Sequence, residues 1–374
     1  MYRHGIHSSS SPWSRLMGRL LSTLKGFLTP GALPHLIEDD LSKNPKRLAA
    51  VCRPVCQDML EQLNYPGAPV LKAESVEALL EYMYRRAVEI GVPLNTRISA
   101  KGFRLGYAEG LLAHPNHSVE AQGYVGLFTW LVVQYDDIVG QNDEMMEEAT
   151  LFHQRFFNGE KQPNNLLEGI ATLLREAHDH YDPVLANQLQ ISVLKFLTSN
   201  LLERHSGFQN MRVTPAGAGV KFPDFYRDMS GMNVAYAVFC YPKDQYPDVG
   251  AFLEAIPDMA RFIDISNDVL SFYKEELGGD DRNYIHNRME VSRKSIPVVL
   301  QETSDEAIAC ARRVDAILKG RGIYAQSWND SVRGYMAMHT TNVRYRLDDL
   351  GLGEVHPLAP FEHKIGELFE RIEK

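Results

Sequence analysis

Apolar residues recur at helical spacing along most of the chain. Residues 75–91 are a clear case, because Val76, Leu79 and Leu80 share one helical face and Gly91 marks the end of the segment. Alternating apolar and polar positions, which mark half-buried strands, and Asn-Gly hairpin turns are almost absent. The pattern predicts an all-α fold with ten or more packed helices.

The same periodicity gives the approximate bounds of these helices. Residues 119–139 are apolar on most sides, which is typical of a helix buried all round. No internal repeat or linker interrupts residues 45–374, so we expect one helical domain there. The predicted helices, separated by Pro, Gly and Asn breaks, are 46–63, 75–91, 105–112, 119–139, 143–157, 165–180, 183–204, 222–238, 247–277, 291–303, 304–320 and 324–347.

Residues 1–44 differ from the rest. Four Lys or Arg residues precede the first acidic residue, Glu38, and serines occupy residues 8–11. That composition fits a transit peptide, but we favour a poorly ordered N-terminal extension with a short helix at 16–27. Arg19 interrupts the apolar run, which argues against a secretory signal, and no stretch of apolar residues is long enough to span a membrane.

Composition and charge narrow the function classes. Of the 374 residues, 44% are hydrophobic and 23% are charged, as in an ordinary globular protein. The net charge of −9 argues against a protein that binds nucleic acid through its phosphates. The four cysteines do not form a disulfide pattern, and no second pair at zinc-ligand spacing accompanies Cys52 and Cys56. We therefore expect a reduced compartment, the cytoplasm.

Three oxygen-bearing side chains form a stripe in the segment 263–277. Asn267, Ser271 and Glu275 stand four residues apart, so a helix places them on one face. An amide, a hydroxyl and a carboxylate suit Mg²⁺ that keeps some waters and takes further ligands from a phosphate. The alternative is a polar helix surface on which Glu275 pairs with a nearby Lys or Arg.

Two aspartates end the long apolar helix. Asp136 and Asp137 follow Tyr135 close to the negative end of the helix dipole, where carboxylates need a cation or a basic group. The alternative is that both lie in a solvated loop and cap the next helix.

Basic residues that suit an anionic leaving group occur at three places. Arg227 stands shortly before Gly231, where a break in the helix would admit a ligand, although a surface salt bridge is the simpler interpretation. Near the end of the last predicted helix, Arg344-Tyr345 offers a cationic fork and a neutral donor. Lys274, within the oxygen stripe, adds a further donor.

Two blocks of sequence resemble a known family. The string Asn267-Asp268-x-x-Ser271-x-x-x-Glu275 resembles the second metal motif of class I terpene cyclases. The longer string NDVLSFYKE and the distal string GYMAMHTTNVRYRL, residues 334–347, are similar to parts of the fungal trichodiene synthase family. Elsewhere between about Asp136 and Leu347 the similarity thins to a shared helix pattern.

The resemblance implies a class I helical bundle at residues 45–374 with three Mg²⁺ ions. It assigns the metal ligands as Asp136 for the first motif and Asn267, Ser271 and Glu275 for the second, and the residues contacting diphosphate as Arg227, Lys274, Arg344 and Tyr345. One departure concerns the first motif, which ends on Gly140 where the family has an acid. Whether Asp137 or Asp143 binds metal therefore stays open.

The implied function is that of a sesquiterpene synthase. Mg²⁺ and the basic donors would neutralise the leaving diphosphate of farnesyl diphosphate, and a dry, aromatic cavity would guide the carbocation to a cyclic hydrocarbon or alcohol of longiborneol or trichodiene type. A prenyl diphosphate synthase and a non-catalytic helical scaffold are the alternatives, and the oligomeric state stays open between a monomer and a homodimer. Aromatic residues near the motifs are the candidate walls: Phe103, Tyr107, Phe128, Trp130, Phe152, Phe196 and Tyr236.

Overall fold

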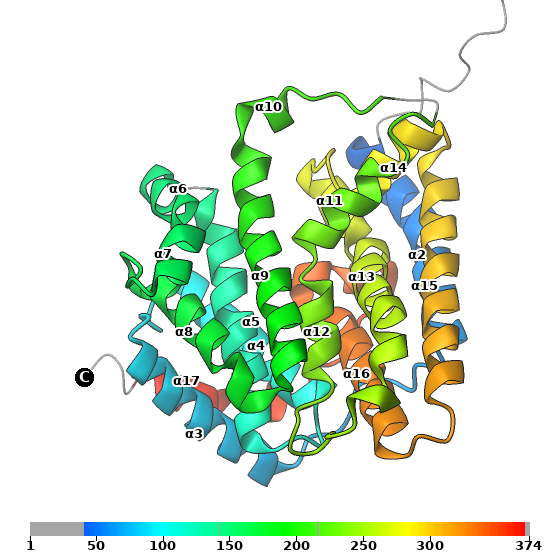
Figure 1. Ribbon diagram of the computed structural model, residues 1–374. Coiled ribbons are helices and arrows are strands. Elements are labelled where there is room, and N and C mark those ends of the chain that lie inside the picture. Colours follow the sequence, from blue (N-terminus) through cyan, green and yellow to red (C-terminus); the bar gives the residue numbers. More distant parts are fainter. Residues whose placement is uncertain (1–40, 141, 215–216, 371–374) are drawn as a thin grey trace, which may run out of the picture. The chain divides into compact units, whose positions relative to one another are not determined.

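The computed structural model describes residues 41–140, 142–214 and 217–370, which form helices joined by turns (Figure 1). Over these ranges no β-strand occurs, which confirms the all-α prediction. The helices are η1 Leu41–Lys43, α2 Pro45–Gln62, α3 Ala73–Ile90, α4 Arg97–Ala113, α5 Val119–Val139, α6 Asp143–Thr150, α7 Phe152–Asn158, α8 Asn165–His180, α9 Pro183–Arg204, α10 Ser206–Gln209, α11 Phe222–Ser230, α12 Asn233–Phe239, η2 Val249–Ala251, η3 Leu253–Ala255, α13 Ile256–Gly278, α14 Tyr284–Ser292, α15 Ile296–Leu318, α16 Ile323–Thr340, η4 Val343–Tyr345, η5 Leu347–Leu350, η6 Ala359–Phe361 and α17 Glu362–Glu370.

The described residues from Ser42 onward form one compact unit. Nearly all of the predicted N-terminal extension, including its short helix at 16–27, lies outside the described residues. Among the described helices, none combines the length and the apolar surface that a bilayer crossing needs.

Three helices have the bounds that the sequence predicts, because their first turns are capped locally. The side chain of Ser118 accepts a hydrogen bond from the amide of Ala121 at the start of α5. Asn164 accepts from the amide of Leu167 at the start of α8. At the start of α9, Asp182 is the capping residue and a proline takes the first helical position.

Other boundaries depend on distant contacts, and there the predictions are wrong. The helix predicted at 222–238 is two helices, α11 and α12, because Met232 between them adopts a positive φ of 50°. The two helices predicted at 291–303 and 304–320 are one, α15. Thr303 and Ser304 at the expected break are fully buried, and the Thr303 hydroxyl donates to the carbonyl of Val299 within the helix at 2.7 Å.

Helices α14 and α17 were not predicted, and the helix predicted at 143–157 is divided into α6 and α7. The last long helix, α16, ends at Thr340 and not at Leu347. The side chain of Asn342 accepts a hydrogen bond from the amide of Arg344 at 2.9 Å and starts the short helix η4 instead.

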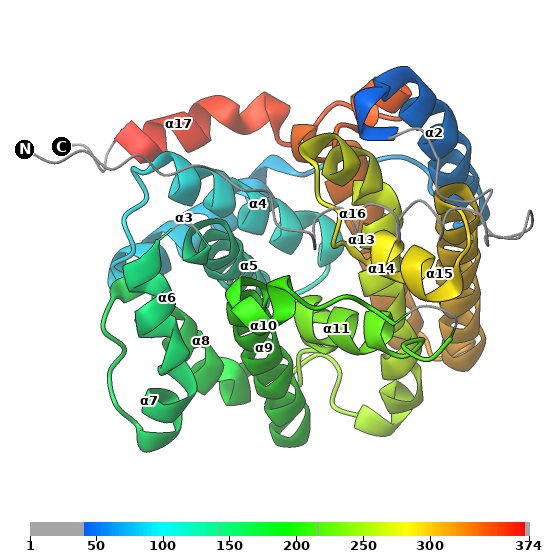
Figure 2. The same cartoon turned by 90° about the horizontal axis from the view of Figure 1, so that it is seen from above.

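The bundle is ordered so that helix ends carrying polar residues meet. Helices α9, α12, α13 and α15 follow one another across it, each packed against the next (Figure 1). Seen from above, α4 lies between α5 and α16 (Figure 2). The C-terminal ends of α5, α9 and α13 lie at the upper end of Figure 1, and we call this end the mouth of the bundle.

The pair α4–α5 is packed at unusually short range. A Cβ atom on Gly106 would overlap the carbonyl oxygen of Gly126, so the two backbones touch where these glycines meet. Beside this contact Phe103 packs edge-on against Trp130 with ring centroids 5.5 Å apart, and the Trp130 indole donates to the hydroxyl of Ser99 at 3.1 Å. The register between α4 and α5 is therefore fixed by backbone contact.

The substitution Gly106→Ala is expected to lower stability by about 3 kcal/mol, because the added methyl forces two backbones apart. Gly366→Ala is the matched control, since nothing lies within 4 Å of a Cβ atom there. Thermal melting compares the two variants with the wild type. Equal melting temperatures for all three would contradict the close α4–α5 contact.

Candidate active site

The predicted oxygen stripe exists on α13. Asn267, Ser271 and Glu275 lie on one face of the helix near its C-terminal end. The Ser271 hydroxyl, which is fully buried, donates to Glu275 Oε1 at 2.6 Å, and Lys274 Nζ donates to the same oxygen at 3.2 Å. One carboxylate, one hydroxyl and one amide oxygen are hard ligands of the kind that Mg²⁺ prefers. The donor set therefore fits that ion.

His339 on α16 orients the first residue of this stripe. His339 Nδ1 lies 2.7 Å from the carbonyl oxygen of Tyr335, and its Nε2 lies 3.0 Å from Asn267 Nδ2. Burial lowers the pKa of His339 to about 4, so the ring is neutral at pH 7. A ring that donates through Nδ1 to a carbonyl accepts through Nε2, so Asn267 presents its NH₂ to His339 and keeps its oxygen for a cation or a donor.

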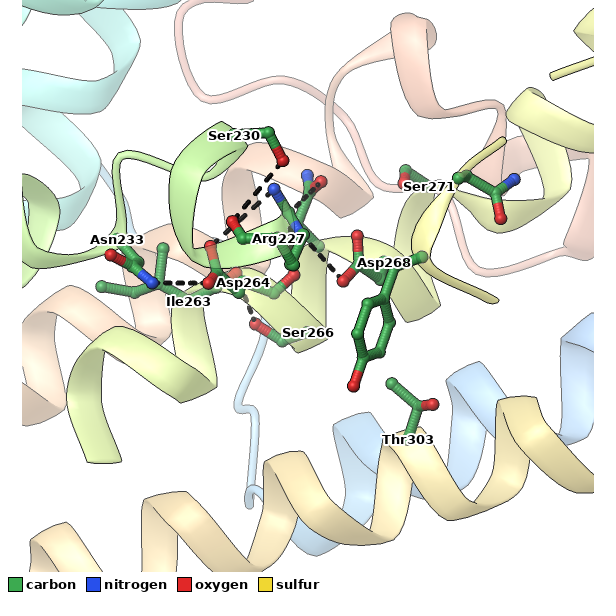
Figure 3. A network of polar contacts seen from close by, with 12 residues as sticks. Arg227, Ser230, Asn233, Ile263, Asp264, Ser266, Asp268, Ser271 and Thr303 are labelled. Atoms are coloured by element: carbon green, nitrogen blue, oxygen red, sulfur yellow. Dashed lines mark hydrogen bonds and ion pairs between the residues drawn. The ribbon is translucent and has the colours of Figure 1, made fainter. Parts of the chain in front are cut away.

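Arg227 lies in a buried ion-pair cluster and not on the surface. Its Nε donates to Asp268 Oδ2 at 2.9 Å, and its Nη2 donates to the carbonyl oxygen of Asp264 at 2.9 Å (Figure 3). Nη2 also lies 3.3 Å from Asn267 Oδ1, which links Arg227 to the oxygen stripe. Burial acts to lower the pKa of Arg227, but the carboxylates of Asp268 and Asp264 outweigh it and raise the pKa.

The break between α11 and α12 makes room for one of these carboxylates. A Cβ atom on Gly231 would overlap Asp264 Oδ1, so only glycine fits there. Asn233, the first residue of α12, donates from Nδ2 to Asp264 Oδ2 at 2.6 Å (Figure 3). The sequence predicted a break that admits a ligand, whereas a carboxylate of the protein occupies this place. Burial raises the pKa of Asp264 to about 7 and that of Asp268 to about 6, although Arg227 opposes both shifts.

Asp136 lies near the end of α5 beside Asp137 and keeps an exposed side chain. The protein around it still raises its pKa by partial desolvation, and neighbouring Asp137 adds to the effect, whereas Arg344, Lys274 and Arg204 lower it. These three cations come from η4, α13 and α9, so Asp136 lies near all three elements. Asp137 pairs with Arg344 at 3.5 Å, so a basic group does meet the two aspartates, as their cost at a helix C-terminus requires.

Gly140, which stands where the first motif of the family has an acid, lies beside Arg204 of α9. A Cβ atom on Gly140 would overlap the guanidinium of the exposed Arg204, so an acidic side chain there would displace the end of this flexible arginine. Asp143, the other acid in question, lies in the first turn of α6, where the helix dipole stabilises a carboxylate.

Arg344 and Tyr345 reach the mouth from η4 and not from a long helix. The Tyr345 ring packs against His339 with centroids 4.1 Å apart, and Lys274 Nζ stands 5.8 Å from the centroid of the same ring. Burial raises the pKa of Tyr345 to about 12, so it is a neutral hydroxyl donor at pH 7. The structure therefore gathers the eight residues singled out in the sequence at one end of the bundle.

We infer an internal space below the mouth from three tyrosine side chains. Tyr236, Tyr335 and Tyr345 come from three elements, and burial raises the pKa of each hydroxyl although each side chain keeps some accessible surface. That combination is expected of side chains that line a cavity. Of the aromatic residues proposed as walls, only Phe196 and Tyr236 keep accessible surface, whereas the other five are fully buried core residues: Phe103, Tyr107, Phe128, Trp130 and Phe152.

Sequence reasoning missed three residues of this site. Asp268 stands inside the recognised motif, yet only the structure reveals that it holds Arg227. Asp264 lies one turn earlier on α13, and its role depends on the break at Gly231. His339 was not singled out, because nothing in the sequence indicates a contact with Asn267 on another helix.

Comparisons with known proteins agree with this geometry. The family described as trichodiene synthase (TRI5) matches residues 112–372. Longiborneol synthase CLM1 of Gibberella zeae is 35% identical over 85% of this chain and 92% of its own length. Terpene synthase BipA of Cochliobolus sativus is 35% identical over 75% of this chain and 82% of its own length.

A solved structure shares the fold. Linalool/nerolidol synthase from Streptomyces clavuligerus, in complex with 2-fluorogeranyl diphosphate, superposes with a TM-score of 0.51 over 73% of this chain and 96% of its own, at 10% identity. This likeness confirms the class I terpene synthase helical fold. With the family match over most of the described residues, it follows that the chain belongs to the trichodiene synthase family of terpene synthases.

Proposed function

We propose that this protein is a sesquiterpene synthase that ionises farnesyl diphosphate, cyclises the resulting cation and releases diphosphate. The observation that carries the proposal is the mouth of the bundle. There the oxygen stripe of α13 and Asp136 of α5 stand among four donors suited to a diphosphate. The identity to a longiborneol synthase over most of both chains supports a cyclic product, of longiborneol type in preference to trichodiene type.

The metal ligands that we propose are Asp136 on one wall and Asn267, Ser271 and Glu275 on the other. Mg²⁺ is in general use in this family, and we propose three ions here. Bound Mg²⁺ supplies Lewis acidity that neutralises the charge developing on the leaving diphosphate. The Ser271–Glu275 hydrogen bond keeps two of these ligands together before any ion arrives.

The four basic or hydroxylic residues act on the diphosphate directly. Arg227 and Arg344 offer planar forks, while Lys274 and Tyr345 offer single donors. Arg227, Lys274 and Arg344 each pair with a carboxylate of the protein. A diphosphate competes for these cations, and Mg²⁺ competes with Lys274 for Glu275, so we expect the two ligands to bind cooperatively.

The test uses purified protein, farnesyl diphosphate and Mg²⁺, with diphosphate release and gas chromatography–mass spectrometry as readouts. We expect diphosphate and a cyclic sesquiterpene, and neither when EDTA removes the metal. Release that requires isopentenyl diphosphate as a second substrate would indicate a prenyl diphosphate synthase instead. No release with any of these substrates would indicate a non-catalytic scaffold.

Glu275→Gln is expected to lower the turnover number by about a hundredfold or more, because it removes the one formal charge of the stripe. Melting temperature should change little. The matched control is the next residue, since Glu276 faces away and accepts from His286 at 2.7 Å. Glu276→Gln should therefore affect stability more than turnover. A wild-type rate for Glu275→Gln at limiting Mg²⁺ would show that the stripe holds no metal.

The two adjacent aspartates should differ in their effect. Asp136→Asn is expected to raise the Mg²⁺ concentration for half-maximal activity by about tenfold and to alter the product mixture. Asp137→Asn should do less, because Asp137 pairs with Arg344 and is not placed as the family pattern requires. Mg²⁺ titrations of both variants make the comparison. Equal losses would mean that the two carboxylates share the ions.

A further inference from the structure

A second acidic group lies inside the bundle, away from the metal motifs. Glu109 on α4 has only 4% of its surface exposed. It comes from the same helix as Gly106, whose backbone touches α5, so α4 cannot move aside to expose it. Within the described part of the chain, Glu109 forms no hydrogen bond and no ion pair. A carboxylate without a partner in such a place costs several kcal/mol, and this cost needs an explanation.

The groups around Glu109 show which space it faces. Its charge raises the pKa of Tyr236 on α12, of Cys240 at the end of α12, of Tyr335 on α16 and of Tyr345 on η4. Three of these are the hydroxyls that line the internal space below the mouth. Glu109 therefore faces that space from the α4 side.

Glu109 lies near an inter-helix contact of α4. A Cβ atom on Gly334 of α16 would overlap the carbonyl oxygen of Leu112, one turn after Glu109, so α4 and α16 touch next to Tyr335. The charges of Glu109 and Glu275 both raise the pKa of Tyr345, so Tyr345 lies near both. None of the four groups whose pKa Glu109 shifts is a cation, and Arg227 and Lys274 are held by other carboxylates. The neighbouring hydroxyls are engaged as well, since Tyr335 donates to the carbonyl of Ile263 at 3.0 Å and Tyr236 pairs with Thr129 at 3.1 Å.

A carboxylate without a partner can accept a proton from a carbocation formed in the same cavity. Burial raises the pKa of Glu109 to about 7, so the carboxylate and the neutral acid are both populated near neutral pH. General acid–base catalysis is most effective when the pKa of the group lies near the working pH. A core position without a chemical role would be more stable with an apolar residue of similar volume.

We propose that Glu109 is the proton acceptor that ends the reaction in the cavity, an assignment that rests on the proposed function above. In one form of the step, a C–H bond beside the cationic carbon breaks, its electron pair forms a C=C bond, and the proton passes to a Glu109 oxygen. In the other form, a water oxygen bonds to the cationic carbon, and the proton lost from that water passes to Glu109. Both forms leave a neutral product and a neutral Glu109, which returns its proton to solvent after product release.

The experiment compares Glu109→Gln, which keeps the shape but removes the base, with Glu120→Gln, an exposed position in the first turn of α5. For each protein, diphosphate release measures ionisation and gas chromatography measures the products. In Glu109→Gln, we expect the main product formed per diphosphate released to fall by about tenfold or more, with early-quenched products replacing it. Melting temperature should hold or rise, because a buried charge is removed. Glu120→Gln should match the wild type in both readouts.

The pH dependence is a second readout that a merely structural role would not move. The carboxylate form is lost as the pH falls through about 7, so the share of the main product from the wild type should decline over that range. The surrounding Tyr236, Cys240, Tyr335 and Tyr345 stay neutral there, since the pKa of each is raised. In Glu109→Gln, the share should not change with pH. Glu109→Asp, which keeps an acid, should keep a pH response.

Water labelled with ¹⁸O identifies the source of the proton, because label enters the main product only when water adds to the cation. An active Glu109→Gln variant with the wild-type product share at every pH would overturn the assignment of Glu109 and leave the proposed function standing. A Glu109→Asp variant whose product share ignores pH would do so too. Wild-type protein that releases no diphosphate would instead overturn the proposed function, and the assignment with it.

Discussion

The structure depends on the mutual neutralisation of buried charges at the mouth of the bundle. Arg227 is held between Asp264 and Asp268, with its Nε 2.9 Å from Asp268 Oδ2. Lys274 pairs with Glu275 at 3.2 Å, on the same helix as both aspartates. Removing the carboxylate partner of Arg227 would leave a buried, uncompensated charge, which costs about 3–5 kcal/mol. Both side chains of the Lys274–Glu275 pair are more accessible, so breaking that pair costs less. The backbone conforms to this requirement, since the break at Gly231 makes room for the Asp264 carboxylate.

The same ion pairs explain how acidic and basic side chains can be stable together at the mouth when no ligand is bound. Diphosphate alone would take Lys274 from Glu275, which would then lie unpaired, and Mg²⁺ alone at Glu275 would displace Lys274. When both bind, diphosphate neutralises Lys274 and Mg²⁺ neutralises Glu275. We therefore propose that the substrate ionises only when the charges at the mouth are neutralised by both ligands.

The sequence predicted the features that depend on neighbouring residues. It did not predict those that depend on residues distant in sequence. The bounds of α5, α8 and α9 follow from capping residues beside them, such as Ser118 and Asn164. The oxygen stripe follows from the spacing of Asn267, Ser271 and Glu275 on one helix. The break before Asn233 does not, because it is set by a carboxylate 31 residues away in sequence. The sequence did not indicate Glu109 either. What distinguishes Glu109 is that it is buried without a partner, and this depends on three other elements of the fold.

The cooperative exchange of partners at the mouth is tested most directly by thermal melting with Mg²⁺ and inorganic diphosphate, added separately and together. Ligands that bind only the folded protein raise its melting temperature in proportion to their binding free energy. The exchange of partners predicts small shifts for either ligand alone and a larger shift for both, with a coupling of about 1–3 kcal/mol. Shifts from the two ligands that simply add would contradict it.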